Sequence, residues 1–174
     1  MARPGSFDDG RGQVRPAETN VGASALDTVS PLTRERVTAA LLELDYPQFQ
    51  DGNGDLGVLW SQAAFHIYLL SEDESVLQVR GAWHRRLALE RLGEVLALLD
   101  SWNREYLGPK CYVRVLDDGF LSIVAETSTP LSSGVSDRQL LRLIERGIGH
   151  GLRVMRALEE RYPDPAAQAP RGML

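Results

Sequence analysis

The sequence predicts an α+β domain in which an antiparallel sheet of about five strands is flanked by three helices. Three segments have apolar residues at helical spacing, and the segments between them are short apolar runs bounded by turn residues. The links between consecutive strands are too short for the crossover connections that parallel strands require. We therefore expect the order helix, four strands, helix, two strands, helix, or the same order with one strand fewer.

The first helix is predicted to open at Ser30 and Pro31, which suit the N-cap and the first helical position. Asp45-Tyr46-Pro47 ends it, because proline cannot continue a helix. Its apolar residues lie on one side at helical spacing: Val37, Ala40, Leu41 and Leu44.

The next segment is typical of an antiparallel meander of short strands. A glycine-rich turn at 51–57 and an acidic turn at 71–75 separate some of these strands. The expected strands are 48–50, 56–60, 65–70 and 76–83.

A second helix is predicted over about 87–103, followed by strands at 111–116 and 120–126. Between these strands, Asp118-Gly119 predicts a two-residue hairpin turn, because both residue types accept positive φ at low cost. The apolar positions of the helix follow the i, i+4, i+7 pattern: Ala88, Leu92, Val95, Leu96, Leu99 and Trp102.

The last helix is predicted to begin at a capping box, Ser136 to Gln139, and to run to about Tyr162. Three glycines between 147 and 151 are each unfavourable by about 1 kcal/mol relative to alanine. They favour close packing of this helix against the sheet or against a second copy, with a local kink or an anion site as alternatives. The expected buried residues are Leu141, Ile144, Ile148, Leu152, Met155 and Leu158.

Length and composition indicate one domain at 30–162, between disordered tails at 1–29 and 163–174. The net charge of −5 disfavours a nucleic-acid partner, since phosphate-binding proteins usually have a basic surface. The apolar runs are too short to span a membrane. The lone cysteine, Cys111, fits a reducing cytoplasm and is interpreted as a small buried side chain. A cytoplasmic location follows.

Several familiar motifs fail on their context, so we predict no catalytic residue, no cofactor and no metal. Gly52 to Gly57 matches GxGxxG, but a strand follows where a dinucleotide site needs a helix. The same loop resembles a calcium loop, yet Leu56 and Gln62 replace the required glycine and glutamate. The three histidines lack ligand spacing, and no serine lies in a GxSxG elbow.

Charge is unevenly distributed along the chain. Residues 37–79 have seven acids and no Lys or Arg, whereas the last helix is rich in arginine. This asymmetry is suited to steering a charged partner or to aligning two copies head to tail. Two solvated faces are the alternative interpretation.

The aromatic residues are more numerous than one face of a small sheet needs. Trp60, Trp83 and Trp102, together with Tyr68 and Tyr112, are either core residues or the lining of a groove or dimer interface.

Several segments together resemble the YbjN-domain family, described as bacterial sensory transduction regulators. The resemblance spans roughly residues 30–163, and its most specific part is Trp102-Asn103 followed by Pro109-Lys110-x-Tyr112. The remaining segments are 57–60, 77–83, Asp117-Asp118-Gly119, Gly134 to Leu140 and Leu158 to Pro163. Eighteen of the 19 basic residues are arginine, which suggests a high-GC genome and an actinobacterial member.

The resemblance implies a fold similar to type III secretion chaperones, in which helices flank a twisted antiparallel sheet and the protein is often dimeric. It implies no activity, since the family has no established catalytic residues. It also implies structural or interface roles for its motif positions: Trp102, Asn103, Pro109, Lys110 and Gln139.

Two functions follow as hypotheses. The first is a non-catalytic, protein-binding regulator or chaperone-like module of unknown partner, expected to be a homodimer. Its candidate binding or interface residues are Trp60, Trp83, Trp102, Asn103, Lys110 and Gln139. The alternative is a sensor of a small anionic metabolite, or an unrecognised enzyme, with Arg146, His150 and Arg153 as an anion site.

Overall fold

A computed structural model describes residues 27–163, so most of both predicted tails lies outside the described residues. The helices are α1 (Arg34–Glu43), α2 (Leu92–Glu105) and α3 (Asp137–Arg161), with a short 3-10 turn, η1, at Leu89–Arg91. The strands are β1 (Gln48–Gln50), β2 (Leu56–Leu59), β3 (Ala63–Leu70), β4 (Val76–Trp83), β5 (Leu87–Ala88), β6 (Lys110–Val115) and β7 (Phe120–Pro130).

The strands form one antiparallel sheet in the order β1-β2-β3-β4-β7-β5, with β6 also paired to β7. The predicted meander and α+β class are confirmed, but the sheet has seven strands where about five were expected. The two-residue β5 was missed, because so short a strand has no periodicity. It continues the edge of β4 and pairs with the first residues of β7.

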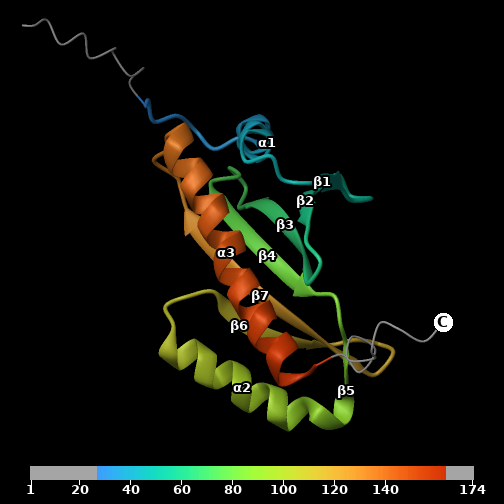
Figure 1. Ribbon diagram of the computed structural model, residues 1–174. Coiled ribbons are helices and arrows are strands. Elements are labelled where there is room, and N and C mark those ends of the chain that lie inside the picture. The colour runs from blue at the N-terminus through green and yellow to red at the C-terminus, as the bar shows by residue number, and fades with distance from the viewer. Residues whose placement is uncertain (1–26, 164–174) are drawn as a thin grey trace, which may run out of the picture.

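Helix α3 lies across the middle of the sheet, with α1 near one end of it and α2 near the other (Figure 1). Its glycines allow the close packing that the sequence predicts. A Cβ on Gly147 would lie 2.8 Å from Val79, and one on Gly151 would lie 2.4 Å from the ring of Phe65. Most of the apolar core lies between α3 and the strands beneath it: Phe65, Ile67, Leu77, Val79, Ile123, Ile144, Ile148, Met155 and Leu158 are buried.

The predicted start of the first helix was wrong. Thr33 is the N-cap of α1, and its hydroxyl accepts a hydrogen bond from the Arg36 amide at 3.3 Å. Ser30 instead forms an antiparallel bridge with Val135, which brings this segment beside the start of α3. The helix therefore starts after Ser30 and Pro31, because Ser30 pairs with the distant Val135 and does not cap α1.

Helix α2 begins at Leu92, later than predicted, and has a narrower buried side. Of its predicted apolar positions, Val95 and Leu99 are buried, whereas Leu96 is 48% exposed. The helix packs along β6 at the margin of the sheet, so less of its surface is covered (Figure 1).

The turn between β6 and β7 is longer than the predicted two-residue hairpin. The Gly119 amide donates to the Leu116 carbonyl at 3.0 Å, and Gly119 has a φ of 78°. Asp118 does not have a positive φ, and the Leu116 amide donates to the Phe120 carbonyl at 2.8 Å. The loop therefore has three residues, 117–119, with glycine in the left-handed position. Arg86 forms an ion pair with Asp118 at 2.7 Å, linking this turn to the segment after β4.

Candidate functional site

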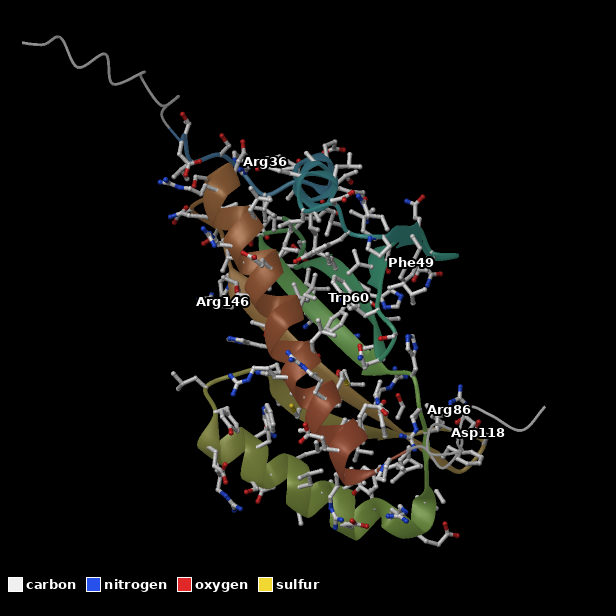
Figure 2. All side chains as sticks on the ribbon, in the orientation of Figure 1. Arg36, Phe49, Trp60, Arg86, Asp118 and Arg146 are labelled. Carbon is white, nitrogen blue, oxygen red and sulfur yellow. The ribbon has the colours of Figure 1, made fainter. Side chains whose placement is uncertain are left out.

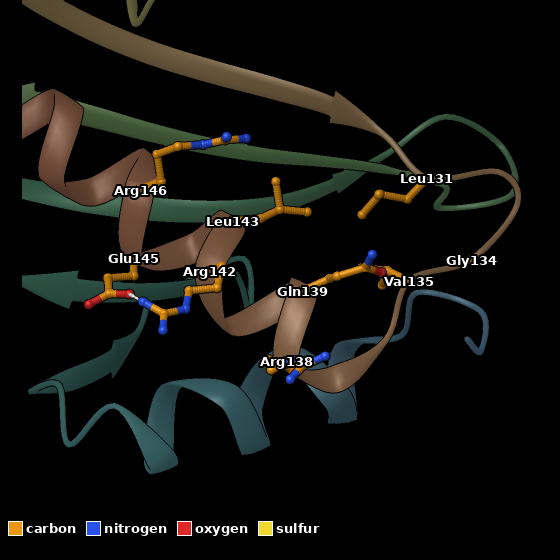
Figure 3. Close-up of a pocket in the computed structure, with 9 residues that line it drawn as sticks. All are labelled: Leu131, Gly134, Val135, Arg138, Gln139, Arg142, Leu143, Glu145 and Arg146. Carbon is orange, nitrogen blue, oxygen red and sulfur yellow. Dashed lines mark hydrogen bonds and ion pairs between the residues drawn. The ribbon is translucent and has the colours of Figure 1, made fainter. Parts of the chain in front are cut away.

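A cavity lies along the first half of α3, where the loop from β7 turns into the helix. Its volume is about 820 Å³. The apolar part of its wall comes from Leu131, Val135 and Leu143, and Figure 3 shows Leu131 and Leu143 projecting into the same space. The complete lining is Leu131, Gly134, Val135, Arg138, Gln139, Arg142, Leu143, Glu145 and Arg146. We call this cavity the α3 groove.

Three arginines line the α3 groove at intervals of four residues along α3, which places them near one another on the helix. Arg138 contacts Asp27 at 3.2 Å, and Arg142 contacts Glu145 at 3.4 Å. Arg146 forms no salt bridge within residues 27–163, and Figure 2 shows it projecting from the flank of α3. The lining has three cations and one carboxylate, so this surface favours an anionic or acidic ligand.

The predicted anion residues follow the α3 groove along the same flank of the helix. Arg146, His150 and Arg153 are separated by four and three positions, the spacing of neighbours on a helix. Burial, and then the charges of the two arginines, lower the pKa of His150 below its usual value. The Arg153 guanidinium lies 5.2 Å from the ring centre of Tyr106, within cation–π range. Only Arg146 lines the groove itself.

The three tryptophans do not share one surface. Trp83 is 3% exposed, and its indole Nε1 donates to Glu159 at 2.6 Å, so it is a core residue and cannot line an open groove. Trp60 is half-buried, with its ring edge-on to Tyr46 at 4.8 Å. Trp102 packs against Tyr106 at 4.4 Å near the end of α2.

Asn103 and Gln139, two of the family-motif residues, make side-chain hydrogen bonds to nearby backbone groups. Asn103 reaches from α2 to β6, where its side chain donates to the Cys111 carbonyl and accepts from the Cys111 amide, both at 2.8 Å. Lys110 is exposed at the start of β6, opposite Glu126 of β7. Gln139 completes the capping box of α3 with Ser136, as predicted, and also lines the α3 groove.

A polar cluster on the sheet face away from α3 was not predicted. Glu126 accepts hydrogen bonds from Arg80 at 3.3 Å and from the Tyr112 hydroxyl at 2.8 Å. The Arg80 guanidinium also lies 5.0 Å from the ring centre of Tyr68. These residues come from three strands, so only the strand register could have revealed the cluster.

The described residues offer no group that resembles a metal site or a reactive thiol. Within 27–163, no three His, Cys, Asp or Glu side chains are arranged to hold a metal ion. Cys111 is buried, as predicted, and its burial raises the pKa of the thiol to about 12. In the same part of the chain, no helix combines the length and apolar character needed to cross a bilayer.

The architecture is that of an α+β protein with a cavity beside α3. The chain belongs to the YbjN family, whose model, "Putative bacterial sensory transduction regulator", matches residues 33–160. The predicted family is thereby confirmed. A search of curated proteins found no match to this chain.

Two solved structures show the same fold at low sequence identity, and a third is also similar to this chain. YbjN from E. coli is 14% identical with a TM-score of 0.65, and the match covers 77% of this chain and 97% of that chain. An uncharacterized protein from Methanothermobacter thermautotrophicus is 15% identical with a TM-score of 0.53, covering 75% and 99%. A chain of the HopA1-SchA chaperone-effector complex is 15% identical with a TM-score of 0.48, covering 75% and 99%.

Proposed function

We propose that this protein is a non-catalytic, protein-binding regulator or chaperone-like module that acts in the cytoplasm as a homodimer. The observation that supports it is the α3 groove, which combines an apolar wall of Leu131, Val135 and Leu143 with exposed arginines. Apolar pockets that exclude water, together with arginine, are where binding energy concentrates in protein interfaces. Membership of a family described as regulators supports the same function.

The test is recovery of a partner from a lysate of the native host by the immobilised full-length chain. Arg146→Glu places a repulsive charge in the groove, and Arg156→Glu makes the same change elsewhere on α3. Both arginines are exposed, and Arg156 does not line the groove. We expect a stoichiometric partner to bind the wild type and Arg156→Glu but not Arg146→Glu. Recovery of no partner, or equal recovery by all three, contradicts the proposal.

The homodimer is tested separately by sedimentation velocity of the full-length chain over a range of concentrations. A species of about twice the chain mass of 19.3 kDa is expected. A monomer at all concentrations contradicts this part of the proposal and leaves the binding function in place.

Sensing of an anionic metabolite is the second candidate function. It is supported by the placement of His150 where the charges of both Arg146 and Arg153 act on it. A ligand that binds the native state raises the melting temperature, so inorganic phosphate and a panel of acidic metabolites are screened by thermal shift. A shift that Arg153→Ala abolishes supports this function, and the absence of any shift removes it.

A further inference from the structure

Strand β7 is longer than the strand on its outer side. On one side, β4 pairs with residues 124–130 of β7. On the other side, β6 pairs only with residues 121–126. Residues 127–130 of β7 therefore have one side without a strand partner in the described part of the chain.

The direction of the backbone groups on this edge follows from the contacts of Asn103. Because Asn103 bonds both the N–H and the C=O of Cys111, these two groups point toward α2 and away from β7. Backbone groups alternate in direction along a strand. The backbone N–H and C=O of Lys110 therefore point toward β7 and pair with the backbone of Glu126. Two residues further along β7, the backbone N–H and C=O of Ser128 point to the same side as those of Glu126.

The N–H and C=O of Ser128 and the C=O of Pro130 consequently face the open side. The pairing of β7 with β4 is consistent with this direction, because the Leu131 amide donates to the carbonyl of Ser75, the residue before β4, at 2.7 Å. The backbone N–H and C=O groups of residues 127 and 129 have the same direction as those of Leu131, so they point toward β4. Ser128 and Pro130 are exposed, so nothing in the described chain covers this edge.

Other edges of the sheet differ from this one. The outer edge of β6 is covered at Cys111 by the Asn103 side chain. The edge strand β1 has three residues, and none of them lines the α3 groove. The open edge of β7 instead leads directly into the α3 groove through Leu131. Unpaired strand edges readily accept another extended chain.

Side chains on the α3 side of an added strand would meet the groove. Thr127 pairs in register with Val79, whose side chain contacts α3 at Gly147, so Thr127 also faces α3. Its hydroxyl oxygen is buried and has no hydrogen-bond partner among the described residues. Apolar side chains of an added strand can approach Leu131 and Leu143, and carboxylates can approach Arg146.

We propose that an extended, acidic segment of a partner protein adds to the sheet at residues 127–130 of β7, with alternate apolar side chains in the α3 groove. Backbone pairing with Ser128 provides affinity, and the arginines select for carboxylates. This inference rests on the proposed function and names the partner segment that the groove accepts.

The probe is a displayed library of random octapeptides selected against the full-length chain. We expect enrichment of sequences in which apolar residues alternate with Asp or Glu. An enriched peptide is then measured against two variants. Ser128→Pro removes the open N–H while leaving the β4 ladder intact, since that N–H points away from β4. Ser128→Ala is the matched control, because it removes only the hydroxyl that accepts from Gln78 at 2.9 Å.

Binding is expected to weaken at least about tenfold with Ser128→Pro and to change little with Ser128→Ala, as one lost backbone bond of about 1.4 kcal/mol implies. In the wild type, exchange of the Ser128 amide hydrogen, followed by NMR, should slow by a similar factor when the peptide binds. This second measurement does not depend on the proline variant folding.

Three results would overturn the inference: no enriched sequence, enrichment of basic sequences, or an unprotected Ser128 amide in the complex. A protein partner that Arg146→Glu loses and Ser128→Pro keeps would retain the proposed function and reject strand addition. If Ser128→Pro instead dissociates a homodimer, the edge is occupied by a second copy and the acidic segment is rejected.

Discussion

At the scale of single residues, the glycines of α3 differ in how much space surrounds them. Gly149 would place a Cβ in open space, whereas Gly151 would place one 2.4 Å from Phe65. The Phe65 ring is fully buried, and a Cβ on Gly81 would also lie 2.4 Å from the same ring atom, so the ring has little room to move aside.

Gly149→Ala is expected to raise the free energy of unfolding by about 1 kcal/mol, because alanine favours a helix over glycine. Gly151→Ala is expected to lower it by about 1–3 kcal/mol through overpacking. Urea unfolding followed by circular dichroism measures both. Equal effects of the two substitutions would show that the contact with Phe65 does not matter.

Cys111 is predicted to be unreactive in the folded chain. Burial raises its pKa to about 12 from an ordinary value of 9.0. A folded pKa above the unfolded value means that the stability associated with the neutral thiol is complete below pH 9 and is lost as the pH rises toward 12. We expect iodoacetamide at pH 8 to modify Cys111 rapidly when the chain is unfolded in about 8 M urea, and slowly when it is folded in buffer. Equal rates would contradict burial of the thiol.

At the scale of elements, Arg36 joins α1 to the start of α3 (Figure 2). Its guanidinium donates to the Asp137 carboxylate at 2.6 Å and to the carbonyls of Ser30 and Val135, both at 2.7 Å. Lysine has one compact ammonium and cannot reproduce this fork of donors.

Arg36→Lys is therefore expected to lower the free energy of unfolding by about 1–3 kcal/mol. Arg34→Lys is the matched control on the same helix. Arg34 is 42% exposed, donates one hydrogen bond to the Gly54 carbonyl at 2.6 Å and lies 3.8 Å from Asp55, and a single ammonium can also make these contacts. Thermal unfolding of both variants gives the comparison. A larger loss for Arg34→Lys would mean that Arg36 does not connect the two helices.

The elements that the sequence predicted well are those with strong local signals. Helix α3 has both a capping box and long apolar periodicity, and the glycine-rich turn at 51–57 separates two strands as expected. The extension of β7 beyond Glu126 was missed, because Thr127 to Pro130 is rich in residues typical of turns. These residues are held in a strand by pairing with β4, which is distant in the sequence.

The α3 groove was only partly predictable for the same reason. Arg146 was identified from the arginine-rich helix, but Leu131 and Val135 belong to the preceding loop, and nothing in their spacing places them beside Leu143. The sequence left Trp83 open as a core or a groove residue, because the exposure of a strand residue depends on what packs over it. In the structure, Glu159 and Tyr162 of the distant end of α3 cover that side chain.

At the scale of the whole molecule, the fold tolerates nearly complete replacement of its sequence. The E. coli structure shares the fold at 14% identity. What such chains have in common is therefore the pattern of apolar positions and turns, rather than particular side chains. The arginines of the α3 groove and the acidic stretch at 37–79 are features of this sequence, and partner choice is expected to depend on them.

The position of β7 between β4 and β6 also affects how the chain is made. Arg80 of β4 and its partner Glu126 of β7 are 46 positions apart, and α3, which covers both strands, is translated after β7. While the ribosome is still adding these residues, the strands already emerged have their helix-facing side, with Phe65 and Val79, open to water. The fold is consequently completed only after α3 has been synthesised, and a translational pause before residue 137 prolongs the interval in which the nascent chain can aggregate.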